Sequence, residues 1–260
     1  MINKLKTFAR YLKDFIRHGQ FSFIYSAVLY ELTGHTRNVD KLYKSSLGYF
    51  YTRGGTLDFQ FANEAYEWSV KKFVFSHYKN YDYFIDIGAN IGTYSILLAN
   101  KGLKVISFEP VNDNYRVFRI NLLLNKLQSK ITTYNIALGE KDTDANFIFD
   151  PINTGASHIA KKSDSDDNTT TVHISTFDSL LPELNIPIEA KIMIKIDVEG
   201  MEIEVLNGAK KFLQSYPNLL LFMESKHSEE NNIREKLDTL GDFEYLRVDN
   251  YNMASKKTII

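Results

Sequence analysis

The stretch of sequence that decides the fold is D-I-G-A-N-I-G at residues 86–92. An apolar run typical of a buried strand precedes it at residues 83–87, and a helical pattern follows at residues 93–100. In doubly wound α/β folds, ligands bind at the carboxyl ends of the strands, where glycine lets the backbone approach them closely. The sequence therefore predicts a ligand-binding turn between a strand and a helix, with Gly88 and Gly92 making the turn.

Polar residues in and after this turn indicate what it binds. Asp86 can accept a hydrogen bond from an ammonium group, and Asn90 offers both a donor and an acceptor. A purely structural strand-to-helix turn would also use glycine, but it leaves these two residues unexplained. Glu109 ends the next apolar strand, 17 residues after Gly92, where a carboxylate can bind both hydroxyls of a ribose. The pair of signals favours a nucleoside-containing cofactor over a solvated charge at a strand end.

A nicotinamide-dependent dehydrogenase shares this logic and is the first alternative. Its fingerprint needs a third glycine, G-x-G-x-x-G, whereas here Gly88 and Gly92 stand alone and Thr93 follows. A carboxylate at Asp86 would repel a pyrophosphate, but it would attract the ammonium group of a methionine. The sign of that charge favours S-adenosylmethionine as the cofactor. A non-catalytic module that only binds the cofactor is the second alternative.

Apolar strands that alternate with helices continue through the rest of the chain and predict a parallel sheet covered on both faces. The expected strands lie at residues 83–87, 104–108, 131–136, 192–197, 219–224, 243–248 and 256–260. The expected helices lie at residues 62–77, 93–100, 112–124 and 202–214. The fold class is therefore α/β, a doubly wound and mostly parallel seven-stranded sheet within a domain at residues 61–260.

A long insertion separates the third and fourth strands of this sheet. It contains short β-type segments at residues 147–149 and 171–174, a loop at 153–155 and a polar run at 163–168. We expect one or two β-hairpins over the ligand-binding edge of the sheet, with the polar run at an exposed loop tip.

Residues 1–60 form an N-terminal helical extension, less regular after Gly34. Its first residues have an apolar stripe at helical spacing and a basic opposite face. The apolar stripe comprises Leu5, Phe8, Leu12, Phe15 and Ile16. A helix of this kind predicts peripheral contact with a membrane surface through residues 1–20. The alternative is a helix packed on the domain with a solvated basic face.

Composition bounds the class of protein. The 260 residues are 44% hydrophobic and 24% charged, as in an ordinary globular protein, and no run is long and apolar enough to span a bilayer. The formal net charge of −1 gives no reason to expect a nucleic-acid partner. Cysteine is absent, which excludes disulfides and thiolate chemistry and suits a cytoplasmic location, on the inner face of a membrane if the N-terminal helix binds one.

The fourth and fifth strands end in candidate catalytic residues. Lys195 and Asp197 are the polar members of an apolar strand and point to the same face, because strand side chains alternate. A buried lysine is costly unless paired, so Asp197 is its expected partner, either in catalysis or in an ion pair that only orients the strand. Glu224 and His227 follow the fifth strand at the same edge. Together with Glu199, the side chains of Asp197, Glu224 and His227 could bind a metal ion. Their spacing matches no metal-binding motif, so we expect no metal.

Beyond these residues, the sequence resembles the FkbM-type methyltransferases, within the class I S-adenosylmethionine-dependent fold. The resemblance covers about residues 62–248, and nothing matches the N-terminal 60 residues. The matching segments are D-I-G-A-N-I-G at 86–92, F-E-P at 108–110, N-I-A-L-G at 135–139, I-K-I-D-V-E-G-M-E at 194–202, V-L-x-G at 205–208, and Glu224. The resemblance implies an O-methyltransferase acting on a hydroxyl of a sugar, glycan, glycolipid or related metabolite.

Together, the resemblance and the residue chemistry imply a set of roles. The residues expected to bind the methionine half are Asp86, Gly88, Asn90 and Gly92, with Glu109 on the ribose, Asn135 and Ala137 near the adenine, and Asp197 where cofactor and acceptor meet. The candidates for removing the proton of the acceptor hydroxyl are Asp197, Glu224 and His227, with Lys195 keeping Asp197 ionised.

Overall fold

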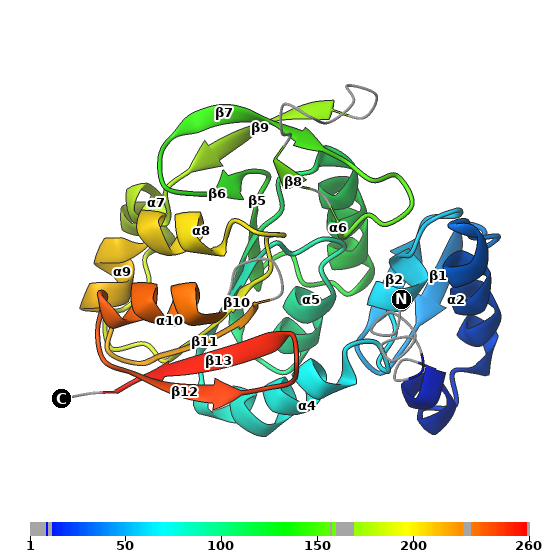
Figure 1. Ribbon diagram of the computed structural model, residues 1–260, viewed down its shortest axis with the longest axis horizontal. Helices are drawn as coiled ribbons and strands as arrows, with labels where there is room; N and C mark the ends of the chain where they lie inside the picture. The colour runs from blue at the N-terminus through cyan, green and yellow to red at the C-terminus, as the bar shows by residue number, and fades with distance from the viewer. Residues whose placement is uncertain (1–8, 10–11, 157, 160–168, 226–229, 259–260) are drawn as a thin grey trace.

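The computed structural model describes residues 9, 12–156, 158–159, 169–225 and 230–258. Its centre is the predicted seven-stranded sheet, whose strands lie in the order β12-β13-β11-β10-β3-β4-β5 (Figure 1). The strands are β3 (Tyr83–Ile87), β4 (Lys104–Phe108), β5 (Ile131–Tyr134), β10 (Ile192–Ile196), β11 (Leu219–Glu224), β12 (Phe243–Arg247) and β13 (Asn252–Lys257). The five strands from β11 to β5 are parallel, and β13 runs antiparallel to both of its neighbours.

Both faces of this sheet are covered by helices, which explains why its central strands are mostly apolar on both sides. Alternate residues of one strand enter different cores: Phe84 packs with one cluster of helices and Ile85 with the other. The first face is covered by α4 (Trp68–His77), α5 (Thr93–Asn100) and α6 (Asn112–Leu124). The second face is covered by α7 (Phe177–Leu184), α8 (Glu202–Gly208), α9 (Lys210–Ser215) and α10 (Glu230–Asp238), as Figure 1 shows. The sheet is therefore doubly wound.

Three predicted elements differ from the structure by several residues, and the strands predicted at 131–136, 192–197 and 243–248 end one or two residues earlier. The helix predicted at 202–214 is two helices; the first ends at Gly208, where a Cβ would lie 1.8 Å from the Gly139 carbonyl oxygen. The helix predicted at 62–77 begins only at Trp68, after Glu67 in the left-handed region. The last strand lies at Asn252–Lys257 instead of 256–260, because a short turn after β12 brings the chain back to pair with β11 earlier than predicted.

The insertion after β5 forms a second sheet of four strands in the order β6-β9-β7-β8. Its strands are β6 (Ala137–Leu138), β7 (Thr143–Ile148), β8 (His158–Ile159) and β9 (Thr169–Ser175). β7 and β9 pair antiparallel, which confirms the predicted hairpin, although both strands are longer than expected. The polar run predicted as a loop tip at residues 163–168 lies outside the described residues.

The N-terminal extension packs against the domain and is not wholly helical. Helical residues 12–17, α2 (Phe21–Thr33) and the small α3 (Asp58–Phe61) flank a hairpin of β1 (Lys41–Lys44) and β2 (Tyr49–Thr52), in a stretch predicted to be irregular. Phe15 is buried against Ala27 and Ala65, which is the packing expected of a helix docked on the domain. The hairpin is held by two amide side chains of the α6 region, since the backbone N–H groups of Tyr49 and Tyr51 donate to Asn125 and Asn121. Across the described residues we find no helix with the length and apolar character needed to span a membrane.

Candidate active site

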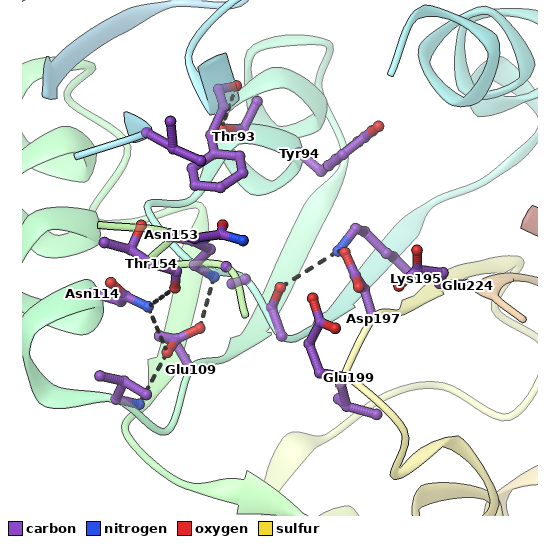
Figure 2. Close-up of a pocket in the computed structure, with 18 of the residues that line it drawn as sticks. Thr93, Tyr94, Glu109, Asn114, Asn153, Thr154, Lys195, Asp197, Glu199 and Glu224 are labelled. Atoms are coloured by element: carbon purple, nitrogen blue, oxygen red, sulfur yellow. Dashed lines mark hydrogen bonds and ion pairs between the residues drawn. The ribbon is translucent and has the colours of Figure 1, made fainter. Parts of the chain in front are cut away.

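A cavity of about 660 Å³ opens at the carboxyl ends of β3, β4 and β10, where doubly wound folds bind ligands (Figure 2). This volume lies within the range of about 300–1,000 Å³ typical of small-molecule sites. The strand ends and the turn after β3 form one wall, the insertion contributes residues such as Phe147 and Thr154, and the N-terminal extension contributes residues such as Tyr30 and Leu57. The extension is therefore part of the site.

Glu109 stands at one end of the cavity, at the end of β4, and is 4% exposed. One carboxylate oxygen accepts the backbone N–H of Asn90 at 2.7 Å, and the other accepts that of Val111 at 2.9 Å. Burial raises the pKa of Glu109 to about 7, although these N–H donors act in the opposite direction. Glu109 thus lies at the strand end where it was predicted, lines the cavity and can accept further hydrogen bonds from hydroxyl groups.

The glycine turn divides into a part that faces the cavity and a part that supports it. Gly88 lines the cavity, with φ of 82°, and a Cβ on it would lie 1.9 Å from the backbone oxygen of Asp197. Asn90 also lines it, and its Oδ1 is buried without a hydrogen-bond partner among the described residues, so a ligand donor would satisfy it. Gly92, predicted to contact the cofactor, is not in the cavity wall; a Cβ there would lie 2.1 Å from the ring of Phe118, so glycine serves the packing of α5.

Asp86 and Asn135 also differ from their predicted roles. The Asp86 side chain is 1% exposed and turns away from the cavity, where it accepts the hydroxyl of Ser95 at 2.5 Å. The side-chain amide of Asn135 donates to the carbonyl oxygens of Glu109 and Pro110, at 2.9 and 3.0 Å, and so holds the segment that carries Glu109. Ala137 does line the cavity, as predicted.

Lys195 and Asp197 form the predicted pair at the end of β10. The Lys195 ammonium lies 2.9 Å from Asp197 Oδ2 and 4.0 Å from Asp86 Oδ1, because Lys195 and Asp86 are neighbours in the register of β10 and β3. Burial opposes the charge on Lys195, but the two carboxylates outweigh burial and raise its pKa above the ordinary value. Figure 2 shows Lys195 and Asp197 across the cavity from Glu109.

Asp197, Glu199 and Glu224 gather at this second end of the cavity, where Figure 2 shows them together. One carboxylate oxygen from each lies within 4.8 Å of the others, and all three side chains are partly exposed. Oxygen ligands so arranged could hold a divalent cation, although acidic groups also cluster without one. His227, the remaining predicted base, lies outside the described residues.

Three residues that the sequence analysis missed complete this end of the cavity. The hydroxyl of Tyr94 donates to Glu67 at 3.1 Å, and the ammonium groups of Lys71 and Lys195 lie 5.3 and 5.5 Å from the centre of its ring. Lys71 is fully buried and donates to the backbone oxygen of Tyr66; burial lowers its pKa to about 8. Glu67 and Lys71 lie four residues apart within the helix predicted at residues 62–77, and this spacing was the available signal.

A buried polar network joins three parts of the chain beside Glu109. The Arg53 guanidinium makes two hydrogen bonds to Asp58, at 2.7 and 2.9 Å, and a third to Asn114 at 2.8 Å. Thr154 donates its hydroxyl to Asp58, and its carbonyl accepts the Asn114 amide at 2.8 Å. The N-terminal extension, α6 and the insertion loop are thus fixed to one another at the cofactor end predicted from Glu109.

Comparison with known proteins gives related sequences and structures. The hexuronic acid methyltransferase AglP of Haloferax volcanii is 28% identical over 130 residues, which are 50% of this chain and 51% of that protein. The chain thus spans about half the length of this curated relative. The FkbM methyltransferase structure from Methylobacillus flagellatus KT is 18% identical, with a TM-score of 0.48 over 68% of this chain and 44% of that chain. The O-methyltransferase TomG of Streptomyces achromogenes, solved with S-adenosylmethionine, is 13% identical, with a TM-score of 0.45 over 74% of this chain and 80% of that chain.

A family model described as the methyltransferase FkbM domain matches residues 86–249. The match begins at the turn after β3 and includes the ends of β4, β10 and β11, which build the cavity wall around Glu109 and Asp197. It confirms the resemblance read from the sequence motifs. Because it covers more than half of the sequence, the chain belongs to the FkbM methyltransferase family.

Proposed function

We propose that this protein is an S-adenosylmethionine-dependent methyltransferase that methylates a hydroxyl oxygen of a sugar, glycan, glycolipid or related metabolite. The observation that carries the proposal is one cavity with Glu109 at one end and Asp197 at the other, both at strand ends within the matched family domain. The family supports methyl transfer, and the relative from Haloferax volcanii, named for a hexuronic acid, supports a sugar-type acceptor.

The residues that line the first end of the cavity fit the cofactor. Glu109 offers two carboxylate oxygens to ribose hydroxyls, and the unpartnered Oδ1 of Asn90 offers an acceptor beside it. Gly88 keeps the backbone open where a side chain would fill the space. Asp86, which the sequence predicted on the methionine ammonium, instead supports Lys195 from behind the wall. When bound, the cofactor supplies a sulfonium-activated methyl group.

The second end of the cavity supplies the groups that act on the acceptor. With the cofactor bound, its sulfonium would supply the methyl group to the acceptor oxygen, and the proton of the acceptor hydroxyl would pass to a carboxylate at this end of the cavity. We assign that carboxylate to Asp197, because Lys195 fixes its orientation at 2.9 Å and it lies on the strand next to the glycine turn. Glu224 is the alternative base on the neighbouring strand.

A labelled-methyl transfer assay tests this function. The purified chain should transfer the methyl group of S-adenosylmethionine to acceptors in a polysaccharide and metabolite extract, and it should not bind a nicotinamide cofactor in a parallel titration. Asp197→Asn should lower turnover by about 10²- to 10⁴-fold while cofactor affinity stays within about threefold. Tight cofactor binding with no transfer to any acceptor would instead indicate a binding module.

If Asp197→Asn remains fully active, Asp197 is not the base. Glu224→Gln is the matched variant for that case, because it removes the alternative carboxylate on β11 and leaves the Lys195 pair intact.

A further inference from the structure

The cavity has a second wall that the family domain does not supply. Tyr30 and Glu31 of α2, Phe61 of α3, and Tyr66 and Glu67 before α4 all line the cavity. Each of these residues precedes the segment at residues 86–249 that matches the family. We call these five residues the N-terminal wall. The strand ends of the cavity thus lie inside the matched family domain, and the N-terminal wall lies before it.

The N-terminal wall combines aromatic rings with carboxylates. Phe61 and Tyr66 pack edge to face, with ring centres 5.5 Å apart. Glu31 lies near Tyr30, where burial first and then the negative charges of Asp150 and Glu31 raise the pKa of the tyrosine. Aromatic faces pack against the C–H faces of a sugar ring, and a carboxylate accepts hydrogen bonds from its hydroxyls. This is the chemistry of a wall that binds a polyhydroxylated ring.

Carboxyl groups outnumber ammonium groups among the side chains that line the cavity. The described residues that line it provide six carboxylates and two ammonium groups. The carboxylates are those of Glu31, Glu67, Glu109, Asp197, Glu199 and Glu224, and the ammonium groups are those of Lys71 and Lys195. A ligand that brings a further negative charge would meet like charge in a partly desolvated site, which is unfavourable.

The two lysines are already engaged and do not offset this charge for a ligand. Lys195 lies between Asp197 and Asp86, at 2.9 and 4.0 Å. Lys71 is enclosed, with no exposed surface, and donates to the backbone oxygen of Tyr66. Neither presents a free ammonium group to the carboxylate of an acidic acceptor. The described wall around the acceptor end therefore offers hydrogen-bond acceptors and aromatic faces.

From these observations we infer that the acceptor is an uncharged polyhydroxylated sugar ring, held by the N-terminal wall, and that Glu31 disfavours acceptors carrying a carboxylate. The inference rests on the proposed function and narrows its substrate class. It separates this chain from the relative in Haloferax volcanii, whose name specifies a hexuronic acid.

The experiment uses matched pairs of methyl glycosides that differ only at C6, which is a hydroxymethyl group in one member and a carboxylate in the other. The glucose and galactose pairs serve as probes. Saturation-transfer NMR on the full chain, saturated with S-adenosylhomocysteine, reports binding independently of methyl transfer. The neutral member of at least one pair should bind about 10- to 100-fold more tightly than its uronide. Equal or tighter binding of the uronides, or binding of neither member, would overturn the inference.

Variants then locate the discrimination. Glu31→Gln should reduce the ratio of affinities between the neutral glycoside and its uronide, because the uronide binds more tightly to the variant. The affinity for S-adenosylhomocysteine should stay unchanged. Glu235→Gln removes the same charge from an exposed position of α10 outside the cavity wall and should leave the preference intact. Equal effects of the two variants would count against a role for the N-terminal wall.

The same protein samples separate the two proposals. Labelled S-adenosylmethionine replaces S-adenosylhomocysteine, and transfer to the bound glycoside is measured. Selective binding of the neutral glycoside without transfer would contradict the proposed function and leave the inference standing.

Discussion

The pKa of Glu109 makes cofactor binding depend on pH. Burial raises this pKa from 4.5 to about 7, so half of the carboxyl groups are ionised at pH 7 and about 1% at pH 5. Ribose hydroxyls bind an ionised carboxylate more strongly than a neutral one. Affinity for S-adenosylmethionine should therefore fall by up to about 50-fold from pH 7 to pH 5, whereas an ordinary pKa of 4.5 would give about 1.3-fold.

Isothermal titration calorimetry between pH 5 and 7 measures this dependence. Over that range an α-amino group, with a pKa of about 7.7–8.0, remains charged and does not interfere. Binding at pH 7 should release about half a proton, visible as a dependence of the heat on the ionisation enthalpy of the buffer. Glu109→Gln should bind more weakly at pH 7, with a flat pH profile. A wild-type profile as flat as that of the variant would refute the assignment of Glu109 to the ribose.

The same pKa affects the stability of the cofactor-free protein in the opposite direction. Because the pKa is raised in the folded state, that state binds more protons than the unfolded chain between pH 4.5 and about 7. The contribution of Glu109 is fully present below pH 4.5 and is lost as the pH rises through 7. Urea denaturation should therefore show that Glu109→Gln loses less stability than the wild type between pH 5 and pH 8.

Three further predictions follow from the contacts around the cavity. Gly88→Ala should lower the free energy of unfolding by at least about 1–3 kcal/mol in urea denaturation and weaken cofactor binding, because the new Cβ would clash with the backbone oxygen of Asp197. The control is Gly102→Ala, which is also at positive φ but has no neighbouring atom within 4 Å, and it should leave cofactor affinity unchanged. Lys195→Met should lower the free energy of unfolding by about 3–5 kcal/mol, since the two carboxylates beside it lose their cation; a loss below about 1 kcal/mol would show that they are solvated. Co-sedimentation with anionic vesicles at low salt tests membrane contact through residues 1–20, which should disappear on their deletion; no binding at low salt would leave only the packing role.

The central strands could be predicted because their environment is uniform. Parallel strands buried on both faces are apolar at most positions, so β3, β4 and β11 lie at the predicted residues. The hairpin of β1 and β2 could not be predicted, because its strands have only four residues each, β1 is largely exposed, and the pair depends on amides of the α6 region some 70 residues away. Local patterns do not record such distant partners.

The site was predicted at the right edge of the sheet but only partly in its contacts. Glu109, Gly88 and Asn90 line the cavity because a strand end and a turn fix their positions locally. The direction of Asp86 depends on its register with Lys195 in a strand more than a hundred residues later, and the sequence does not specify that register. The N-terminal wall was missed for the same reason, since it reaches the cavity only through tertiary packing.

The network of Arg53, Asp58, Asn114 and Thr154 limits how this protein could be re-engineered. Arg53 and Asp58 belong to the N-terminal extension, whereas Asn114 lies on α6 and Thr154 on the insertion loop. The side chain of Asp58 accepts hydrogen bonds from Arg53 in the extension and from Thr154 in the loop. A chimera that exchanges residues 1–60 for the extension of another family member would leave Asn114 and Thr154 without these partners unless an arginine and an acid arrive together. New acceptor preferences would therefore have to be transplanted as a matched set of extension, helix and loop.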